Sequence, residues 1–136
     1  MDIKKELNDY EIFVFSTDTN GQHQNYDGRY AVSRLGAIIG KGEGIMGNSY
    51  AIPIFQIKNG FQILFNETEQ VKYICNFIDF ACSNPKHIFI ISNNFGIDKN
   101  ERTTTEIRNI FHKSILKCGF DIDNIPKNII LPKIFI

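Results

Sequence analysis

Short apolar runs of strand length alternate with longer amphipathic segments along this chain, and that alternation restricts its fold more than any other feature. Glu11–Ser16 is a β-branched and aromatic run, and His87–Ser92 is a continuous apolar run that suits a strand covered on both faces. Two longer segments carry the apolar spacing of helices. Strands that alternate with helices predict an α/β fold, in which helices cover a parallel or mixed sheet.

The two longer segments also carry start signals for helices. Asn66 is followed three residues later by Glu69, and Thr103 is followed three residues later by Glu106, which is the spacing of a capping box. We expect the first helix to run to about Cys82, and the second to occupy residues 103–118, because Gly119 stops it.

The remaining segments are shorter. We expect a helix over Gly28–Leu35, with Asp27 as its N-cap, and a strand over Ser49–Ile54 that ends through the stiffening at Pro53. Two further strands are predicted, over Phe61–Leu64 and over residues 128–132. No linker or repeat interrupts the chain. The prediction is therefore one α/β domain over residues 1–136, a layered mixed sheet flanked by helices.

Composition removes several classes of function. The 136 residues include 15 Lys and Arg against 15 Asp and Glu, so the net charge is zero and an extended nucleic-acid surface is not expected. No apolar run reaches the length of a membrane span, and Met1–Glu6 lacks the apolar core of a secretory signal. The three cysteines are odd in number, which predicts reduced thiols in a cytoplasmic protein. They form no Cys-x-x-Cys pair and the three histidines are scattered, so we expect no metal site and no cofactor.

Three polar, glycine-bearing loops follow predicted strands. They are Thr17–Asp27, Gly40–Gly47 and Asn93–Asn100. Ligands of α/β proteins collect at the carboxyl ends of strands, so we expect the site where these loops meet. Asp18, directly after the first strand, is a candidate to accept hydrogen bonds from a base or ribose, or to act as a general base; a local backbone acceptor is the alternative.

The glycine loop is the candidate for phosphate contact. Gly42, Gly44 and Gly47 would allow backbone N–H groups to approach a phosphate, with Lys41 as the charge partner. Their spacing matches a dinucleotide fingerprint, but the loop leads into a strand instead of a helix, so that motif is discounted. The alternative is a mobile connecting loop. Gly21 and Gly96 are the glycines expected to contribute from the other two loops.

His23 and two arginines complete the candidates for the site. His23 is the only histidine in a predicted site loop and has the pKa range for proton transfer, although a solvated loop histidine is the simpler interpretation. Arg29 and Arg34, on the first predicted helix, are candidates to pair with a phosphate, and surface ion pairs are their commoner role.

Three runs of the sequence carry a family resemblance. They are Val14–His23, Gly36–Pro53 with its Gly-x-Gly-Glu-Gly-x-x-Gly-x-Ser-Tyr-Ala-Ile-Pro block, and Pro126–Pro132. In these runs the chain resembles a family of small, uncharacterised bacterial and phage non-structural proteins. The layout of that family is in turn similar to macro domains, which bind ADP-ribose and related nucleotides. The resemblance implies a macro-domain-like fold and a nucleotide-type ligand, such as ADP-ribose or a signalling nucleotide, which the protein would sequester.

Two other functions stay open at this point. The first is a hydrolase of ADP-ribosyl or phosphate esters, in which Asp18 or His23 would steer water. The second is a non-enzymatic, oligomeric interaction module that would use exposed aromatic side chains, with Tyr26, Tyr30 and Phe95 as candidates.

Overall fold

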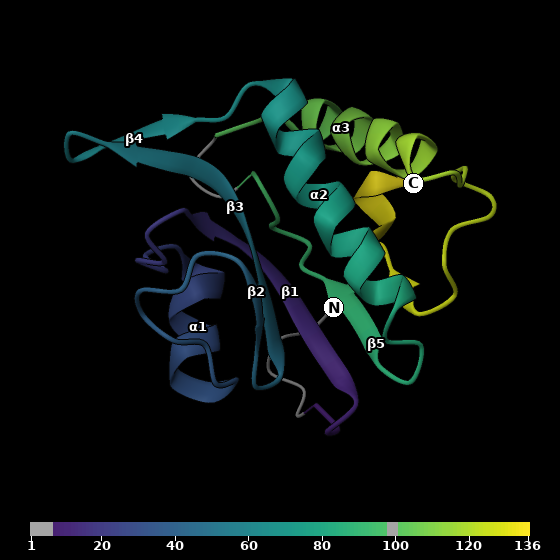
Figure 1. Ribbon diagram of the computed structural model, residues 1–136, viewed down its shortest axis with the longest axis horizontal. Helices are drawn as coiled ribbons and strands as arrows, with labels where there is room; N and C mark the ends of the chain where they lie inside the picture. Colours follow the sequence, from purple (N-terminus) through teal and green to yellow (C-terminus); the bar gives the residue numbers. More distant parts are fainter. Residues whose placement is uncertain (1–6, 98–100) are drawn as a thin grey trace.

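The computed structural model describes residues 7–97 and 101–136, and within them a mixed sheet lies between helices on both faces (Figure 1). Residues 1–6 and the end of the predicted loop Asn93–Asn100, residues 98–100, lie outside this description. The strands are β1 (Glu11–Asp18), β2 (Gly44–Met46), β3 (Ser49–Lys58), β4 (Phe61–Leu64), β5 (Ile88–Ile91) and β6 (Ile129–Ile130). The helices are α1 (Tyr26–Arg34), α2 (Glu67–Cys82) and α3 (Thr104–Lys117), with a final 3₁₀ turn over Lys133–Phe135. The predicted α/β class is confirmed.

The strand order in the sheet is β2-β3-β1-β5-β6, and β4 pairs with the outer half of β3. β1 is parallel to both of its neighbours, β3 and β5, and β5 is parallel to β6. β2 and β4 run antiparallel to β3. β1 thus lies at the centre of the parallel part, which explains why every residue of this strand after Glu11 is buried.

Alternate residues of β1 face the two layers of helices. Phe13 and Phe15 pack with Ala31 of α1 on one face, whereas Ile12 and Val14 belong to the larger core beneath α2 and α3. In the larger core, the rings of Tyr50, Phe77, Phe80 and Phe89 meet at centroid distances of 5.2 to 6.4 Å. The sheet is therefore held from both sides, and its strand ends are free to form a site.

Helix starts agree with the sequence in two of three cases. α2 and α3 begin with complete capping boxes, Asn66 with Glu69 and Thr103 with Glu106. The predicted start of α1 is wrong, because Asn25 and not Asp27 is the N-cap: the Asn25 side chain accepts from Gly28 N at 2.7 Å. Asp27 lies inside the first turn and points into the protein, where it is 2% exposed.

β3 continues past Pro53, contrary to the prediction that the strand ends there. Thr17 pairs with Pro53 but Asp18 pairs with Phe55, so a bulge directly follows the proline, a position at which strands accommodate proline. The Pro53 carbonyl accepts from Gln70 Nε2 at 3.1 Å. Beyond the bulge, β3 and β4 form a hairpin that projects from the body of the protein (Figure 1).

The turn of this hairpin is the dipeptide Asn59-Gly60. Both residues have positive φ, 51° and 80°, as a two-residue type I′ turn requires. Strand β4 agrees with the predicted strand Phe61–Leu64, and its partner is the part of β3 that the sequence interpretation left out. β2, inside the predicted glycine loop, was not expected at all.

Candidate functional site

The sheet has a topological switch point at the carboxyl ends of β1 and β5. From β1 the chain crosses to β3 on one side, and from β5 it crosses to β6 on the other side. The loops that leave these two neighbouring strands therefore diverge and open a crevice between them, which is the usual place for a ligand in an open α/β sheet. The candidate site lies at this edge.

Buried hydrogen bonds join the elements around the crevice. Asn25 Nδ2 donates to the Ser16 carbonyl at 2.8 Å, which attaches the start of α1 to the end of β1. The Ser92 hydroxyl donates to Asp27 Oδ2 at 2.5 Å, and both residues are 2% exposed. Because Ser92 directly follows β5, this contact holds α1 to the second strand of the switch point. The rim is thus fixed by polar side chains that sequence reasoning had not paired.

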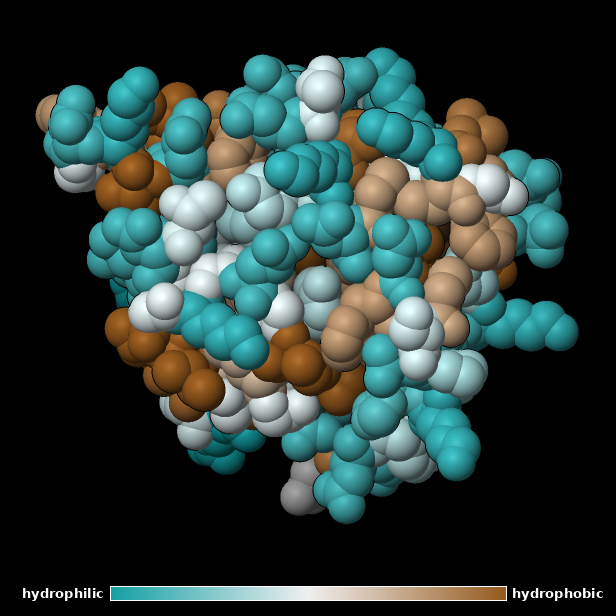
Figure 2. All heavy atoms as spheres, in the orientation of Figure 1, coloured by the Kyte–Doolittle hydropathy of each residue, from teal (hydrophilic) through white to brown (hydrophobic). Residues whose placement is uncertain are grey.

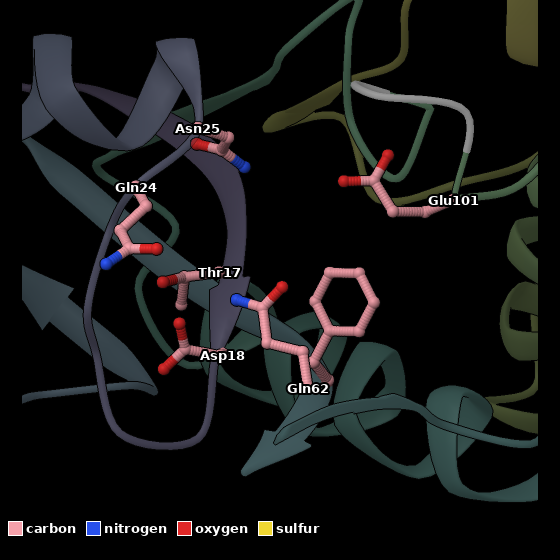
Figure 3. A pocket seen from close by; sticks show the side chains of 7 residues that line it. Thr17, Asp18, Gln24, Asn25, Gln62 and Glu101 are labelled. Atoms are coloured by element: carbon pink, nitrogen blue, oxygen red, sulfur yellow. The ribbon is translucent and has the colours of Figure 1, made fainter. Parts of the chain in front are cut away.

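A small hollow opens above these contacts, and we call it the polar hollow. Figure 3 shows carboxylate and amide side chains around it, from the end of β1, the following loop, the β3–β4 hairpin and the segment before α3. Its lining residues are Thr17, Asp18, Gln24, Asn25, Phe55, Gln62 and Glu101. Its volume is about 40 Å³. That is room for one or two waters, or for the hydroxyl groups of a larger ligand.

Asp18 forms the base of the loop that borders the polar hollow. It is 2% exposed, and its Oδ1 accepts from Asn20 N at 2.9 Å and from Gln22 N at 3.2 Å. This arrangement is an Asx turn, the local role that the sequence left as an alternative. The same side chain lines the polar hollow, so the turn also holds a carboxylate at the site (Figure 3).

His23 lies beneath the loop and is neither solvated nor placed for proton transfer. Its ring is 2% exposed, with Nδ1 at 2.7 Å from Thr17 Oγ1 and Nε2 at 2.9 Å from the Ile38 carbonyl. The carbonyl can only accept, so Nε2 carries the proton and donates it, and in the neutral ring Nδ1 accepts from Thr17. Both nitrogens are therefore occupied, and the expectation of a solvated loop histidine is wrong. The phenyl ring of Phe15 meets the imidazole edge-on at 5.2 Å.

Two of the predicted glycines lie where two loops press together. A Cβ on Gly42 would lie 2.4 Å from the Asp18 carbonyl oxygen, and one on Gly21 would lie 2.4 Å from Lys41 N. Gly40 N also donates to the Gly21 carbonyl at 3.0 Å. These positions require glycine because backbone contacts backbone, and that requirement alone accounts for the residue type. Their contact with a phosphate stays a prediction.

The other predicted ligand residues lie in different places. Lys41 Nζ donates to the Ile45 carbonyl at 2.9 Å, and Lys41 does not line the polar hollow. Antiparallel β2 carries the chain away from the carboxyl edge, so Gly47 packs against Gly36 and the Leu35 carbonyl, near the amino end of β3. Gly96 is buried near the crevice, and its N–H donates to Ser16 Oγ at 3.4 Å.

Three of the seven residues that line the polar hollow, Phe55, Gln62 and Glu101, lie outside the loops that sequence reasoning proposed for the site. Gln62 lies on β4 and comes to the site only because the hairpin folds over the end of β1. The Asn59-Gly60 dipeptide was the available signal for that hairpin. Glu101 comes from the segment before α3, and no local pattern marks it.

The polar hollow suits groups that donate hydrogen bonds. Asp18 and Glu101 are carboxylates, and the other polar members are amides and one hydroxyl, whereas no Lys or Arg is among the described residues that line it. A phosphate inside would meet two negative charges. A vicinal diol, an amino group or an ammonium would instead find acceptors.

Comparisons of the chain with models of protein families, with curated proteins and with solved structures found no match. Over residues 7–97 and 101–136, no helix has the length and apolar character needed to cross a membrane. The same residues hold no group of three His, Cys, Asp or Glu side chains arranged to bind a metal ion.

Proposed function

We propose that this protein binds a nucleotide-type ligand through the hydroxyl or amino groups of its nucleoside part, with those groups in the polar hollow. One observation carries the proposal: carboxylate and amide side chains surround a hollow at the switch point of the sheet. The resemblance to macro-domain-like proteins supports the same ligand class, ADP-ribose or a signalling nucleotide, and a role in sequestering it.

The chemistry of the hollow favours the ribose over the phosphate. Two backbone N–H groups hold Asp18 Oδ1, which leaves Oδ2 to accept from a ribose hydroxyl without reorganisation of the side chain. The polar hollow has a volume of about 40 Å³, which is enough for ribose hydroxyl groups, and the rest of a nucleotide would lie over the opening of the hollow. Phosphate groups would stay outside, away from the carboxylates of Asp18 and Glu101.

The alternative functions have less support. A hydrolase that uses His23 would need a free ring nitrogen, and both nitrogens of that ring are engaged. The aromatic surface expected of an interaction module is incomplete: Tyr26 is 58% exposed, but Tyr30 is half-buried and Phe95 is fully buried against Phe111. Phe95 is therefore a core residue, and its predicted exposure was wrong.

Titration calorimetry with adenosine, ADP-ribose, NAD and a cyclic nucleotide tests the proposal. We expect at least one of them to bind, and Asp18→Asn to weaken it about tenfold, the effect of losing one charge-assisted hydrogen bond. Asn keeps the oxygen that accepts from residues 20 and 22, so the fold is retained, which a thermal melt verifies.

A pair of glutamine variants separates the hollow from the rest of the hairpin. Gln62→Ala removes a lining side chain and should weaken binding several-fold, whereas Gln56→Ala, on the paired strand but outside the lining, should leave affinity unchanged. Absence of binding at millimolar ligand across the panel would contradict the proposal, as would equal affinity in wild type and Asp18→Asn.

A further inference from the structure

A second hollow, of about 270 Å³, lies beside the loop that borders the polar hollow. We call it the apolar hollow. Its lining residues are Gln22, His23, Gln24, Arg29, Val32 and Ile39, from the loop after β1, from α1 and from the connection to β2. Its volume approaches the lower end of about 300 Å³ for small-molecule sites, whereas the polar hollow alone is far too small for a whole ligand.

The two hollows are immediate neighbours. Gln24 lines both of them. In addition, Asp18 of the polar hollow accepts at 3.2 Å from the N–H of Gln22, which lines the apolar hollow. The loop around Gln22 and Gln24 therefore forms a wall that the two hollows share, and a ligand that occupied both would lie across it.

The walls of the apolar hollow differ in kind from those of the polar hollow. Val32 is half-buried and Ile39 is 61% exposed, so both offer apolar surface to this hollow. Figure 2 shows apolar side chains gathered at the lower left of the molecule, over the region of α1 and its connection to β2. A ligand that covered Ile39 would remove the exposed apolar surface of that side chain from water.

Arg29 supplies a planar cation to the same hollow. It is exposed, and its guanidinium makes no hydrogen bond or ion pair with the residues that the structure describes. A guanidinium plane stacks on the faces of nucleobases and other aromatic rings. The glutamine amides beside it have the donor and acceptor pair that matches the edge of a base.

The loop is held rigidly between these walls. The two hydrogen bonds of the buried His23 ring tie the loop to β1 and to the Ile38 carbonyl, directly before Ile39. The apolar wall and the glutamines are therefore positioned before any ligand arrives, which lowers the entropy lost on binding.

We propose that the apolar hollow takes the base of the nucleoside whose ribose occupies the polar hollow, with the ring between the Arg29 guanidinium and the aliphatic side chains of Val32 and Ile39. This inference rests on the proposed function and deepens it, because it assigns the two parts of the ligand to two hollows. A phosphate contact by Arg29 is the competing assignment. Arg29 and the glutamine amides could donate to either group, but the aliphatic side chains of Val32 and Ile39 offer contact surface to a ring and none to a phosphate.

The test compares adenosine, its 5′-monophosphate and free ribose by titration calorimetry. Arg29→Ala and Ile39→Ser should each weaken adenosine about tenfold, the effect of losing one stacking or apolar contact with a base. Both should leave the affinity for ribose unchanged, because ribose lacks the base. Arg29→Lys should resemble Arg29→Ala, because lysine keeps the charge but lacks the plane.

Two matched controls lie on the same elements. Arg34→Ala changes an exposed arginine of α1 that does not line the apolar hollow, and Ile38→Ser changes a neighbour that is 58% exposed. Neither control should alter adenosine affinity. All four positions are exposed, so each variant is expected to fold, and a thermal melt verifies it.

The outcomes separate this inference from the proposed function. If Asp18→Asn weakens adenosine while Arg29→Ala and Ile39→Ser do not, the base assignment is wrong and the polar hollow stands. If Arg29→Ala weakens only the monophosphate, and Arg29→Lys restores its affinity, Arg29 binds phosphate and the base assignment is again wrong. If adenosine and ribose do not bind but ADP-ribose, NAD or the cyclic nucleotide does, the proposed function stands and the base assignment is wrong. If no member of either panel binds, both proposals fail.

Discussion

Replacement of Ser92 by alanine measures what the contact between α1 and β5 contributes to the fold. The Ser92 hydroxyl donates to Asp27 Oδ2 at 2.5 Å inside the protein. Ser92→Ala takes this donor away from a buried carboxyl oxygen, and the loss of a donor to a buried acceptor costs about 1 to 3 kcal/mol, with the larger values at fully buried sites such as this one. The N–H of Asn94 loses its acceptor as well, but Asn94 is exposed and water replaces the serine oxygen. We therefore expect a loss of about 2 to 3 kcal/mol.

The expected loss converts to a shift in melting temperature. At about 2.1 cal/mol/K of unfolding entropy per residue, 1 kcal/mol corresponds to about 3.5 °C for a chain of 136 residues. The melting temperature of Ser92→Ala should fall by about 7 to 10 °C.

Urea denaturation and a thermal melt at pH 7 measure both quantities. Ser33→Ala is the control, because its hydroxyl donates only to the Tyr30 carbonyl on the exposed face of α1, and its effect should stay within about 0.5 kcal/mol. If Ser92→Ala loses no more stability than Ser33→Ala, the buried contact does not hold the rim, and the reasoning about a pre-formed site is refuted.

Two further predictions concern the loops and the core. Gly42→Ala should destabilise the protein by about 3 kcal/mol, at the upper end for an overpacked site. The reason is that the added Cβ would lie 2.4 and 2.5 Å from the backbone oxygens of Asp18 and Thr19. If urea denaturation gave the variant the stability of the wild type, the close contact of the two loops would be contradicted. Burial, aided by the charge of Glu43, raises the pKa of Tyr50. Above pH 10 the phenol therefore ionises in the unfolded chain first, and stability falls by up to about 1.4 kcal/mol per pH unit. Tyr50→Phe should reduce the loss of unfolding free energy between pH 9 and pH 11. If the unfolding free energies of wild type and Tyr50→Phe fell in parallel over that range, the phenol would not be the cause.

Sequence reasoning worked where the deciding interactions are local. The capping boxes that start α2 and α3 span only four residues each, so the sequence contains all their partners. The apolar run of β5 could be interpreted because a strand covered on both faces needs apolar residues at successive positions. The α/β class follows from those elements alone.

The errors fall where distant parts of the chain decide the local structure. Pro53 interrupts no strand because a bulge against β1 accommodates it. Asn25 caps α1 while its amide reaches back to Ser16. The site divides in the same way: Asp18 follows a recognisable strand, but Gln62 reaches the polar hollow through a hairpin and a sheet pairing that local patterns do not contain.

The hairpin formed by the end of β3 and by β4, which we call the arm, can change in length without a change in the rest of the fold. Its outer half pairs only with itself, past the last residue of β1, so residues added or removed at Asn59-Gly60 would leave the packed layers undisturbed. The arm also carries Gln62, which pairs with Ile57 and lines the polar hollow. The exposed turn can therefore vary in length while Gln62 keeps its place at the polar hollow.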